Sequence, residues 1–403
     1  MRIAIWENLP PGGAKRAAFE LGRALATRHE LDLYRLHTTS QAAFDLQPFV
    51  RQVYQYRYAP AFGLFDGRLA QGRLAPRTLT VFGPLRRLHR RIANDMRRRY
   101  YDVVLAHTDG MTQSPYLLRW IGQPPTVYFC QEVPRIAEER WLREKWQQER
   151  PRARGVLGAL VQAEDRLVMR RLIVEDRRNV AAAHTLLVNS RYMRERVFSV
   201  YARTATLCYL GIDPERLRPD PDVVKVDEVL SIGSPLWIKG HELVIDALAL
   251  LPNEHRPLLR VVAQSARGSQ ALEQHAAIRG IRLAIETGID EASLADRYRR
   301  ARITICAARL EPFGLTAIES MACGTPVIAI DEGGYRETVL SGETGLLVDP
   351  KPEALSVAMG QLLSDPERAR TLGLNGRARV ERCWTWSKSA QRLESILQRI
   401  GTD

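Results

Sequence analysis

One stretch of the chain joins a strand end, a glycine turn and a helix start: Leu310-Glu311-Pro312-Phe313-Gly314-Leu315-Thr316-Ala317-Ile318-Glu319-Ser320-Met321-Ala322-Cys323-Gly324-Thr325-Pro326. It follows an apolar run over residues 303–307 that predicts a strand. Pro312 and Gly314 then interrupt the pattern before a helix that is expected to begin near Leu315. The unpaired amides of residues 314–316 would point out of the N-terminus of this helix, where the positive end of its dipole also lies. Such a helix end is suited to bind a phosphate.

Two carboxylates flank this helix end. Glu311 lies just before the predicted helix, and Glu319 lies one turn inside it. Carboxylates accept hydrogen bonds from hydroxyls, and sugars present hydroxyls in neighbouring pairs. A nucleotide-sugar would use all three features, with one glutamate on the hexose, the other on the ribose and the diphosphate on the amides. The stretch therefore predicts a nucleotide-sugar site.

Strands alternate with helices along the whole chain. Residues 2–6 form an apolar run, residues 8–13 break it with prolines and glycines, and residues 14–27 have helical periodicity. Short apolar runs return at residues 102–106, 125–130, 185–189, 228–233, 259–263, 303–307 and 327–330. Such runs, separated by helical stretches, predict an α/β fold with parallel sheets covered by helices on both faces. We expect two sheets, one on either side of a linker rich in proline and aspartate at residues 211–222.

Length and composition are those of a globular protein with more than one domain. The 403 residues and 45.7 kDa exceed the usual size of one domain, which excludes a peptide hormone, a zinc knuckle and a disulfide-held mini-scaffold. With 45% hydrophobic and 26% charged residues, the chain differs from those that stay disordered. The five cysteines are scattered without a Cys-x-x-Cys pair, which indicates neither a zinc site nor a disulfide framework. No stretch approaches about 18 consecutive apolar residues, so we expect a reduced, cytoplasmic protein without a transmembrane helix.

Positive charge is concentrated in the first half of the chain. The net charge is +13, and it divides into +16 for residues 1–205 and −3 for the remainder. Of the 59 basic residues only six are lysines, a preference that genomic bias also explains. The asymmetry suggests that the first half meets a polyanion, either a membrane surface or nucleic acid.

The most basic segment is Val81 to Tyr101, where seven arginines interleave with apolar residues. On a helix, Leu85, Leu88, Ile92 and Met96 would form one apolar stripe beneath a basic face. One interpretation is an exposed helix whose stripe packs on the sheet. Another is a helix whose cations touch anionic lipid head groups, at about 1 kcal/mol per residue. Nucleic acid is the third candidate for the basic face.

Further motifs accompany the two glutamates. Glu311 and Glu319 have seven residues between them, and the turn Ala322-Cys323-Gly324-Thr325-Pro326-Val327 and then Gly333-Gly334 follow. In this order they resemble the signature of the retaining, GT-B-fold glycosyltransferases of family 4, which include bacterial mannosyl- and glucosyltransferases. The resemblance continues in Gly342-Glu343-Thr344-Gly345-Leu346-Leu347-Val348, in Ser231-Ile232-Gly233 to Lys239-Gly240-His241, and in Gly12-Gly13-Ala14-Lys15-Arg16. It spans the whole chain and is specific mainly from residue 230 to residue 350.

The resemblance implies two facing Rossmann-like domains with a cleft between them. The basic N-terminal domain would comprise residues 1–210 and bind the acceptor. The C-terminal domain would comprise residues 211–383 and bind the nucleotide-sugar. The last helix, within residues 384–403, would cross back onto the N-terminal domain. The alternative is a last helix that simply completes the second domain.

The resemblance also implies roles for single residues, with Glu311 and Lys239 as the candidate catalytic pair. Glu311 would meet hydroxyls of the donor sugar, and Glu319 would hold the ribose. Lys239 would contact the diphosphate, to which a compact ammonium charge is suited. For each of these three the alternative is a solvated surface charge. The other donor-binding candidates are the amides of Gly314, Leu315 and Thr316 with the adjacent Phe313, Gly12 and Gly13 from the facing domain, and Ile289 at the base. The alternative for Ile289 is a turn without a role in binding.

Two positions depart from the family pattern. Where relatives usually carry Gly-Arg-Leu ahead of the lysine, this chain has Gly-Ser-Pro, so Ser234 replaces a guanidinium beside the diphosphate and Arg16 is the candidate substitute. Gln131 stands where relatives often carry a histidine. Glutamine keeps the hydrogen bonds and loses the titratable proton, so Gln131 is assigned to binding the acceptor or the sugar. The alternative for Gln131 is a polar loop residue.

The mechanism that the family implies is front-face attack, in which the leaving phosphate oxygen accepts the proton of the acceptor hydroxyl. A helix N-terminus and cations would stabilise the leaving diphosphate, so no metal and no cofactor besides the nucleotide-sugar are expected. His107-Thr108-Asp109 is not interpreted as a hydrolase triad, because no Gly-x-Ser-x-Gly elbow accompanies it. The first turn also lacks the Gly-x-Gly-x-x-Gly pattern of dehydrogenases.

The sequence therefore predicts a retaining hexosyltransferase that uses a UDP- or GDP-sugar. A lipid or lipid-linked acceptor is the first choice because the excess positive charge lies in the acceptor half, and a soluble oligosaccharide or small molecule comes next. Such an enzyme would act in the cytoplasm, at the inner face of the membrane, with no nucleic acid as partner. The competing hypothesis is a catalytically silent protein of the same fold that binds a membrane or nucleic acid, motivated by Ser234 and Gln131.

Overall fold

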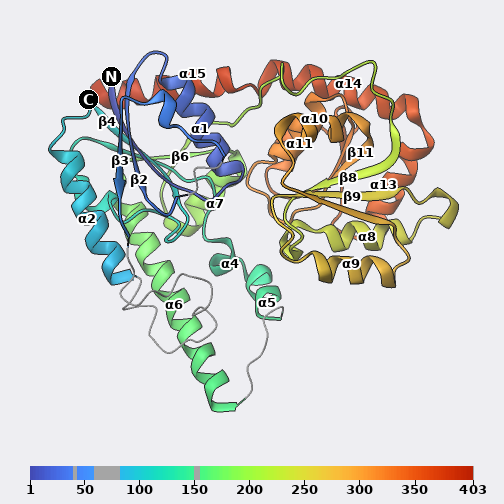
Figure 1. Ribbon diagram of the computed structural model, residues 1–403, viewed down its shortest axis with the longest axis horizontal. Helices are drawn as coiled ribbons and strands as arrows, with labels where there is room; N and C mark the ends of the chain where they lie inside the picture. Colours follow the sequence, from blue (N-terminus) through green and yellow to red (C-terminus); the bar gives the residue numbers. More distant parts are fainter. Residues whose placement is uncertain (40–42, 59–81, 149–154, 403) are drawn as a thin grey trace. The chain divides into compact units, whose positions relative to one another are not determined.

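The structure is a computed structural model, and it describes residues 1–39, 43–58, 82–148 and 155–402. The chain divides into two compact units. The first contains Met1–Asn189, Met193–Cys208 and Ala390–Asp403, and the second contains Ser190–Tyr192 and Tyr209–Ser389. Figure 1 shows the helices and strands of both, coloured along the chain. Each unit is built around its own parallel sheet.

In the described part of the first unit the sheet has the strand order β3-β2-β1-β4-β5-β6-β7, and neighbouring strands are parallel. Its strands are β1 (Arg2–Asn8), β2 (Glu30–Leu36), β3 (Gln52–Tyr56), β4 (Val103–Asp109), β5 (Thr126–Phe129), β6 (Thr185–Val188) and β7 (Thr206–Leu207). Ile5 in β1 is in register with Leu33 in β2 and with Leu105 in β4, so apolar side chains meet on one face. The strand order reverses between β1 and β4, as in doubly wound α/β folds.

Helices cover this sheet (Figure 1). They are α1 (Gly13–Leu25), α2 (Gly83–Arg97), α3 (Leu118–Ile121), α4 (Arg135–Glu138), α5 (Arg140–Gln148), α6 (Gly155–Ala182), most of α7 (Arg191–Tyr201) and most of α15 (Trp386–Thr402), with the 3-10 helix η1 (Gln47–Phe49). α2 packs against α3, and α3 packs against α6. Glu394 of α15 accepts a hydrogen bond from Arg28 over 2.9 Å and lies 3.0 Å from Nε2 of His29. These contacts fasten the end of the chain to the turn after α1.

The basic segment contains α2, while Val81 lies outside the described residues. Leu85, Ile92 and Met96 are buried and Leu88 is half-buried, as the predicted apolar stripe requires. The opposite face of α2 is basic and exposes Arg86, Arg87, Arg90, Arg91 and Arg97, and Arg98 is exposed just after the helix. The helix therefore packs on the first unit through its stripe and leaves the arginines on the surface.

In the described part of the second unit the sheet has the order β10-β9-β8-β11-β12-β13, again with parallel neighbours. Its strands are β8 (Val226–Ile232), β9 (Leu258–Ala263), β10 (Leu283–Thr287), β11 (Ala301–Cys306), β12 (Val327–Ile330) and β13 (Gly345–Val348). The chain runs outward from β8 through β9 to β10 and then crosses to β11 on the other side of β8. Here the strand order reverses between β8 and β11.

Helices cover both faces of this second sheet, with α8 and α9 on one face and α10 and α11 on the other (Figure 1). The helical elements are η3 (Trp237–Lys239), α8 (His241–Ala249), η4 (Asn253–His255), α9 (Ser269–Ile278), α10 (Glu291–Arg300), α11 (Leu315–Ala322), α12 (Tyr335–Thr338), α13 (Pro352–Ser364) and α14 (Pro366–Cys383). Val244 of α8, Leu272 of α9 and Met359 of α13 belong to one buried core with Val229 and Ile305 of the sheet. This core holds β8 and β11 side by side.

The α/β prediction is confirmed, and several predicted elements have nearly the observed bounds. The apolar run at residues 327–330 is β12 itself, and the helix expected near Leu315 begins at that residue. β2, β3, β7, β10 and β13 have no counterpart among the predicted runs. The boundary between the units falls at residue 209, just before the expected linker. Within the part of the chain that the structure describes, no helix has the length and apolar character that crossing a membrane requires.

Two histidines are sealed in the core of the first unit. His89 on α2 and His107 on β4 are fully buried, and no hydrogen-bond partner reaches their ring nitrogens among the described residues. Burial lowers the pKa of each to about 4, and for His89 the negative charge of Asp109 opposes the shift. Both rings are therefore neutral near pH 7.

We expect the protein to lose stability as the pH falls from about 6.5 to about 4. In this window the unfolded chain binds protons at these histidines, with a pKa near 6.5, while the folded chain does not. Each histidine then costs up to about 3 kcal/mol of unfolding free energy at the acid end. Urea unfolding at pH 7.5 and pH 5 measures the loss. His89→Phe keeps the ring contact with Trp6 and should weaken the pH dependence, and an unchanged dependence in this variant would contradict the assignment.

Candidate active site

The strand reversal in the second unit marks where an α/β sheet binds ligands. In such sheets the crevice lies outside the carboxyl ends of the two strands between which the order reverses. Here those strands are β8 and β11. The loop after β8 carries Lys239 and the loop after β11 carries Glu311, so the topology brings together two residues that are 72 positions apart.

Lys239 and Glu311 form an ion pair. Nζ of Lys239 lies 3.3 Å from Oε2 of Glu311, and the two side chains are 33% and 20% exposed. Because both charges remain partly solvated, the pair contributes little to stability. The two residues predicted as the catalytic pair therefore contact each other directly, and a ligand can reach both.

The loop that carries Lys239 depends on two glycines. Gly233 has a φ of +142°, and a Cβ there would lie 2.9 Å from Cγ of Lys239. Gly240 has a φ of +74°, and a Cβ there would lie 2.1 Å from the carbonyl oxygen of Ala307. Only glycine fits such positions without displacing its neighbours. Ser234 lies in this loop, just after the carboxyl end of β8, and is half-buried.

His241, the first residue of α8, supports the same loop. Its Nδ1 lies 2.9 Å from Oγ of Ser231, and its Nε2 lies 3.2 Å from the carbonyl oxygen of Gly233. Burial lowers the pKa of His241 to about 4, so the ring is neutral at neutral pH. A neutral ring satisfies both neighbours when Nε2–H donates to the carbonyl and Nδ1 accepts from the serine hydroxyl. His241 belongs to the motif that carries Lys239, but the sequence pattern assigns it no role.

The N-terminus of α11 lies at the same carboxyl edge of the sheet. Gly314 caps it with a φ of +97°, and a Cβ there would lie 2.8 Å from the ring of Tyr335. Leu315 and Thr316 form the first turn and are half-buried. Their amides belong to the helix end whose N–H groups lack partners inside the helix, so a phosphate can accept hydrogen bonds from them.

Glu319 lies one turn further into α11 and is 5% exposed. The hydroxyl of Tyr298, on α10, donates a hydrogen bond to Oε2 of Glu319 over 2.7 Å. Burial raises the pKa of Tyr298 well above its usual value, and the charge of Glu319 adds to this effect. Tyr298 therefore stays protonated and fixes one oxygen of the carboxylate. Tyr298 is absent from the predicted site because nothing in its sequence neighbourhood points to a partner on another helix.

Phe313 and Ile289 differ from the other candidates in where their side chains lie. Phe313 is 2% exposed, and its ring centroid is 5.5 Å from that of Trp384 and 6.2 Å from that of Tyr209. Its ring therefore anchors the loop in the unit, and only its backbone is left for a donor. Ile289 is half-buried between β10 and α10, at the far edge of the sheet, and its contact with a base stays a prediction.

The candidates of the first unit lie at that unit's own strand reversal, between β1 and β4. Gly12 is the N-cap of α1, and a Cβ there would meet nothing within 4 Å. Gly13 begins the helix, and the half-buried Arg16 donates its backbone N–H to the carbonyl oxygen of Gly12 over 3.0 Å. The approach of these residues to a donor stays a prediction.

Lys15, which the sequence pattern does not nominate, is almost fully buried beneath this turn. It is 1% exposed, and its Nζ lies 3.6 Å from Oε1 of Glu7, which is 3% exposed. Burial raises the pKa of Glu7, and the charge of Lys15 opposes the shift. Because a buried charge needs a partner, this pair fastens the first turn of α1 to the end of β1.

Gln131 follows β5 and is 4% exposed. Its side-chain Nε2 donates to the backbone carbonyl oxygen of Ala14 over 3.1 Å, and its backbone carbonyl oxygen accepts from Nδ2 of Asn189 over 3.0 Å. Gln131 is thus tied to the first turn of α1. The structure gives it a clear supporting role, while direct binding of a sugar or acceptor stays a prediction.

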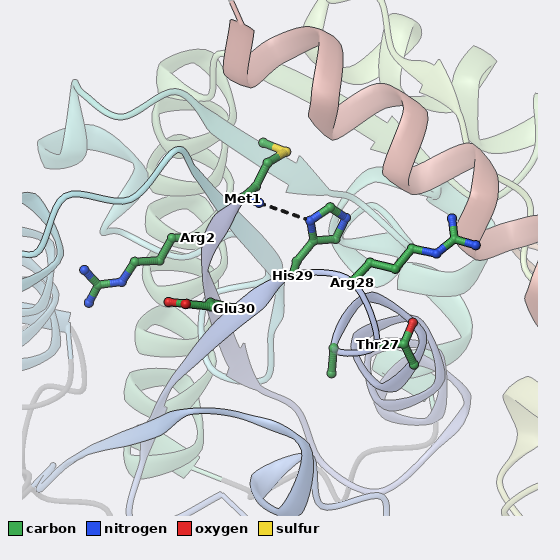
Figure 2. A pocket seen from close by; sticks show the side chains of 7 residues that line it. Met1, Arg2, Thr27, Arg28, His29 and Glu30 are labelled. Carbon is green, nitrogen blue, oxygen red and sulfur yellow. Dashed lines mark hydrogen bonds between the residues drawn. The ribbon is translucent and has the colours of Figure 1, made fainter.

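A surface hollow of the first unit lies away from these residues. Figure 2 shows it at the amino-terminal ends of β1 and β2, where the amino group of Met1 lies 3.3 Å from Nδ1 of His29. Arg2, Arg28 and Glu30 also line it. It opens at the sheet edge opposite to the carboxyl ends, so it is separate from the candidate site. In the described ranges no group of three or more His, Cys, Asp or Glu side chains is arranged to hold a metal ion.

Comparisons with known proteins place the second unit in one family. The family described as "Glycosyl transferases group 1" matches residues 215–379, which include the Lys239, Glu311 and Glu319 positions. A D-inositol 3-phosphate glycosyltransferase 2 of Catenulispora acidiphila is 30% identical over 295 residues, which cover 66% of this chain and 68% of that protein. The chain belongs to the group 1 glycosyltransferases.

Two further similarities extend over different lengths of this glycosyltransferase. A GDP-mannose-dependent alpha-(1-6)-phosphatidylinositol monomannoside mannosyltransferase of Mycolicibacterium smegmatis is 30% identical over 230 residues, or 52% of this chain. That match spans 60% of the relative's length, less than two thirds. A solved sucrose-phosphate synthase from Thermosynechococcus elongatus has the same fold, with a TM-score of 0.73, 23% identity and coverage of 99% of this chain and 98% of that one. The glycosyltransferase therefore has two Rossmann-like domains of the GT-B type.

Proposed function

We propose that this group 1 glycosyltransferase moves a hexose from a UDP- or GDP-sugar to an acceptor hydroxyl with retention of anomeric configuration. The observation that carries the proposal is the Lys239–Glu311 pair beside the N-terminus of α11, with Glu319 one turn inside. This arrangement offers a cation and backbone amides to a diphosphate. It also offers one carboxylate to the sugar hydroxyls and a second to the ribose.

In the proposed mechanism the acceptor attacks from the face that the diphosphate leaves. The bond between C1 and the phosphate oxygen breaks through an oxocarbenium-like state, and that oxygen accepts the proton of the acceptor hydroxyl. Lys239 and the α11 amides stabilise the charge that develops on the diphosphate, and Glu311 orients the sugar. When the donor binds, the diphosphate takes over the ammonium of Lys239, and Glu311 leaves the ion pair to accept hydrogen bonds from hydroxyls.

The first unit also carries residues that we propose bind the donor or the acceptor. Gly12 and Gly13 let a backbone approach the diphosphate, and Arg16 supplies the positive charge that Ser234 does not. Gln131 acts on the same turn through its hydrogen bond to the carbonyl of Ala14.

The names of the relatives support an anionic acceptor. One relative is named for a phosphatidylinositol monomannoside and the other for D-inositol 3-phosphate, and both of these molecules carry a phosphate. Residues 1–205 carry a net charge of +16, which attracts such an acceptor. We therefore propose a lipid-linked acceptor first and a glycan second. GDP-mannose, for which the Mycolicibacterium smegmatis relative is named, is one donor to be tested beside the UDP-sugars.

Metal independence is tested with a chelator. A thermal-shift panel first identifies the nucleotide, because a ligand at about 100 times its Kd stabilises by about 2.7 kcal/mol. We then expect transfer, or slow hydrolysis of the donor, to proceed equally fast in excess EDTA and in Mg²⁺, since Lys239 and α11 supply the positive field. Turnover that stops in EDTA and returns with Mg²⁺ would contradict the mechanism. Failure to bind or hydrolyse every nucleotide-sugar would favour the alternative, a catalytically silent protein of this fold.

We also propose that the protein acts in the cytoplasm, where α2 lies on the anionic inner face of the membrane. The helix exposes five arginines on one face, with Arg98 exposed just after its end, while its apolar stripe is buried. The contact would therefore be electrostatic and weakened by salt. We expect the protein to float with phosphatidylglycerol vesicles, not with phosphatidylcholine vesicles, and to detach in about 1 M salt, where the Debye length is about 3 Å.

A charge-matched pair of variants localises this contact. Arg86→Glu with Arg90→Glu should reduce flotation, while Arg368→Glu with Arg370→Glu, on exposed positions of α14, should not. If the protein floats with neither kind of vesicle at low salt, the membrane contact is wrong, and the positive charge contributes to solubility only.

A further inference from the structure

The residue before Glu311 has an unusual backbone conformation. Leu310 has a φ of +52°, in the left-handed region that a leucine rarely occupies. Such a conformation persists only when the surrounding structure holds it, and residues of this kind gather at ligand sites. If Leu310 relaxed to an ordinary conformation, the chain would turn at this point and the side chain of Glu311 would move away from Lys239.

Glu332, in the loop after β12, holds this strained turn. Its Oε2 accepts a hydrogen bond from the backbone N–H of Leu310 over 3.2 Å and another from Nε of Arg309 over 2.8 Å. Its Oε1 lies 2.7 Å from a terminal nitrogen of Arg309. The carboxylate of Glu332 thus binds both the backbone N–H of Leu310 and the guanidinium of Arg309. Glu332 and Arg309 are 15% and 27% exposed, so solvent screens this bidentate contact only in part.

The two residues after Glu332 hold the other side of the same turn. The backbone N–H of Gly334 donates to the carbonyl oxygen of Glu311 over 2.8 Å. A Cβ at Gly333 would lie 2.4 Å from that oxygen, and a Cβ at Gly334 would lie 2.5 Å from Cα of Phe313. The glycines therefore allow the loop after β12 to pack directly against the backbone of residues 311–313. Because residues 333 and 334 are glycines, Glu332 is the residue of this loop segment that adds a side chain to the contact.

We propose that Glu332 is a positioning residue, which holds Leu310 in its left-handed conformation so that the carboxylate of Glu311 faces the donor sugar. The inference rests on the proposed function of Glu311. It adds a residue outside the Glu311–Glu319 motif, and it connects the loop after β12 to the chemistry of the loop after β11. Glu332 acts through Glu311 and does not itself touch the donor.

The first test is Glu332→Ala in the full chain. Transfer from the donor identified by the nucleotide panel should fall in kcat by about 10- to 100-fold, the effect of displacing a reacting group by about 1 Å. The affinity for UDP or GDP should stay within about twofold, because Lys239 and the N-terminus of α11 remain in place. Glu332→Gln keeps an acceptor for the N–H of Leu310 and loses the charge, so it should lie between the wild type and the alanine variant.

A second substitution distinguishes positioning from general stability. Asparagine adopts the left-handed conformation more readily than leucine. Leu310→Asn should therefore restore at least about threefold of the lost kcat in the Glu332→Ala protein and change the wild type little. A merely structural role for Glu332 would lower the thermal midpoint of the variant without changing kcat of the folded protein, and Leu310→Asn would not rescue transfer.

Asp331→Ala is the matched control. Asp331 is the neighbouring acid, and its carboxylate pairs with Arg336 over 2.8 Å at an exposed position instead of gripping residues 309–311. We expect wild-type kcat for this variant. Folded Glu332→Ala or Glu332→Gln protein with wild-type kcat, or a loss that Leu310→Asn does not rescue, would overturn the inference while leaving the proposed function intact. A wild-type protein that turns over no nucleotide-sugar would overturn the proposed function, and this inference with it.

Discussion

Replacing Glu311 with alanine is expected to lower kcat for sugar transfer by about 10²- to 10⁴-fold. The proposed role of this carboxylate is to accept two hydrogen bonds from the donor sugar, and each bond to a charged group contributes about 1.5–3 kcal/mol. The fold should remain intact, because Glu311 is 20% exposed and the Lys239 ammonium that loses its partner is 33% exposed. Steady-state kinetics with the identified donor, together with a thermal midpoint near that of the wild type, measure both expectations.

The variant also separates the sugar from the nucleotide. Affinity for UDP or GDP alone should change little, because Glu311 is assigned to the hexose. Glu353→Ala, which removes an exposed glutamate from the first turn of α13, is the control and should behave as wild type. Near-normal turnover by Glu311→Ala with every donor tested would show that the site is assigned wrongly.

Replacing Lys239 with alanine is expected to lower kcat by about 10²- to 10³-fold, the size seen when one group that stabilises transition-state charge is removed. The ammonium pairs with Glu311 at the strand reversal, and its stem packs on Gly233. Arginine should rescue poorly, because its planar, branched head does not fit where a compact charge pairs at 3.3 Å. Kinetics of the two variants give the comparison.

Binding assays then assign the effect to the diphosphate. The Lys239→Ala protein should lose affinity for UDP or GDP and retain its affinity for the corresponding nucleoside. Lys351→Ala provides the control, because Lys351 pairs with Asp349 at an exposed position instead of with Glu311. Unchanged affinity for the diphosphate in Lys239→Ala would remove the lysine from the mechanism.

The fold was predictable where apolar residues run together and not where charges are buried. β12 is a continuous apolar run and β4 begins with one at residues 103–106, and this pattern alone indicates a buried strand. β2 has Asp32 in its interior, and this residue is fully buried only because Arg2 and Arg51 reach it from other segments. Those partners are known only once the sheet has formed. Edge strands such as β10 are half-buried and carry too few apolar residues to stand out.

The site was predictable to the extent that its residues lie in one continuous motif. The helix end, Glu311 and Glu319 occur within a single stretch, and the structure finds the helix where the pattern expects it. Tyr298 and Glu332 act on those glutamates from other elements through hydrogen bonds that no local pattern encodes. The burial of Gln131 against Ala14 was also not predictable from the sequence, because that contact joins positions 117 residues apart.

The pairing of β8 with β11 also determines when a donor site can first exist. Lys239 and Glu311 leave the ribosome 72 residues apart, and three strands, β9, β10 and β11, are made between them. A nascent chain that ends before β11 contains the lysine but has neither of the two carboxylates nor the helix end that we propose binds the diphosphate. If the nucleotide-sugar binds as proposed, it can stabilise only a chain that has been synthesised past α11. It would then stabilise the completed unit and could not assist the early steps of its folding.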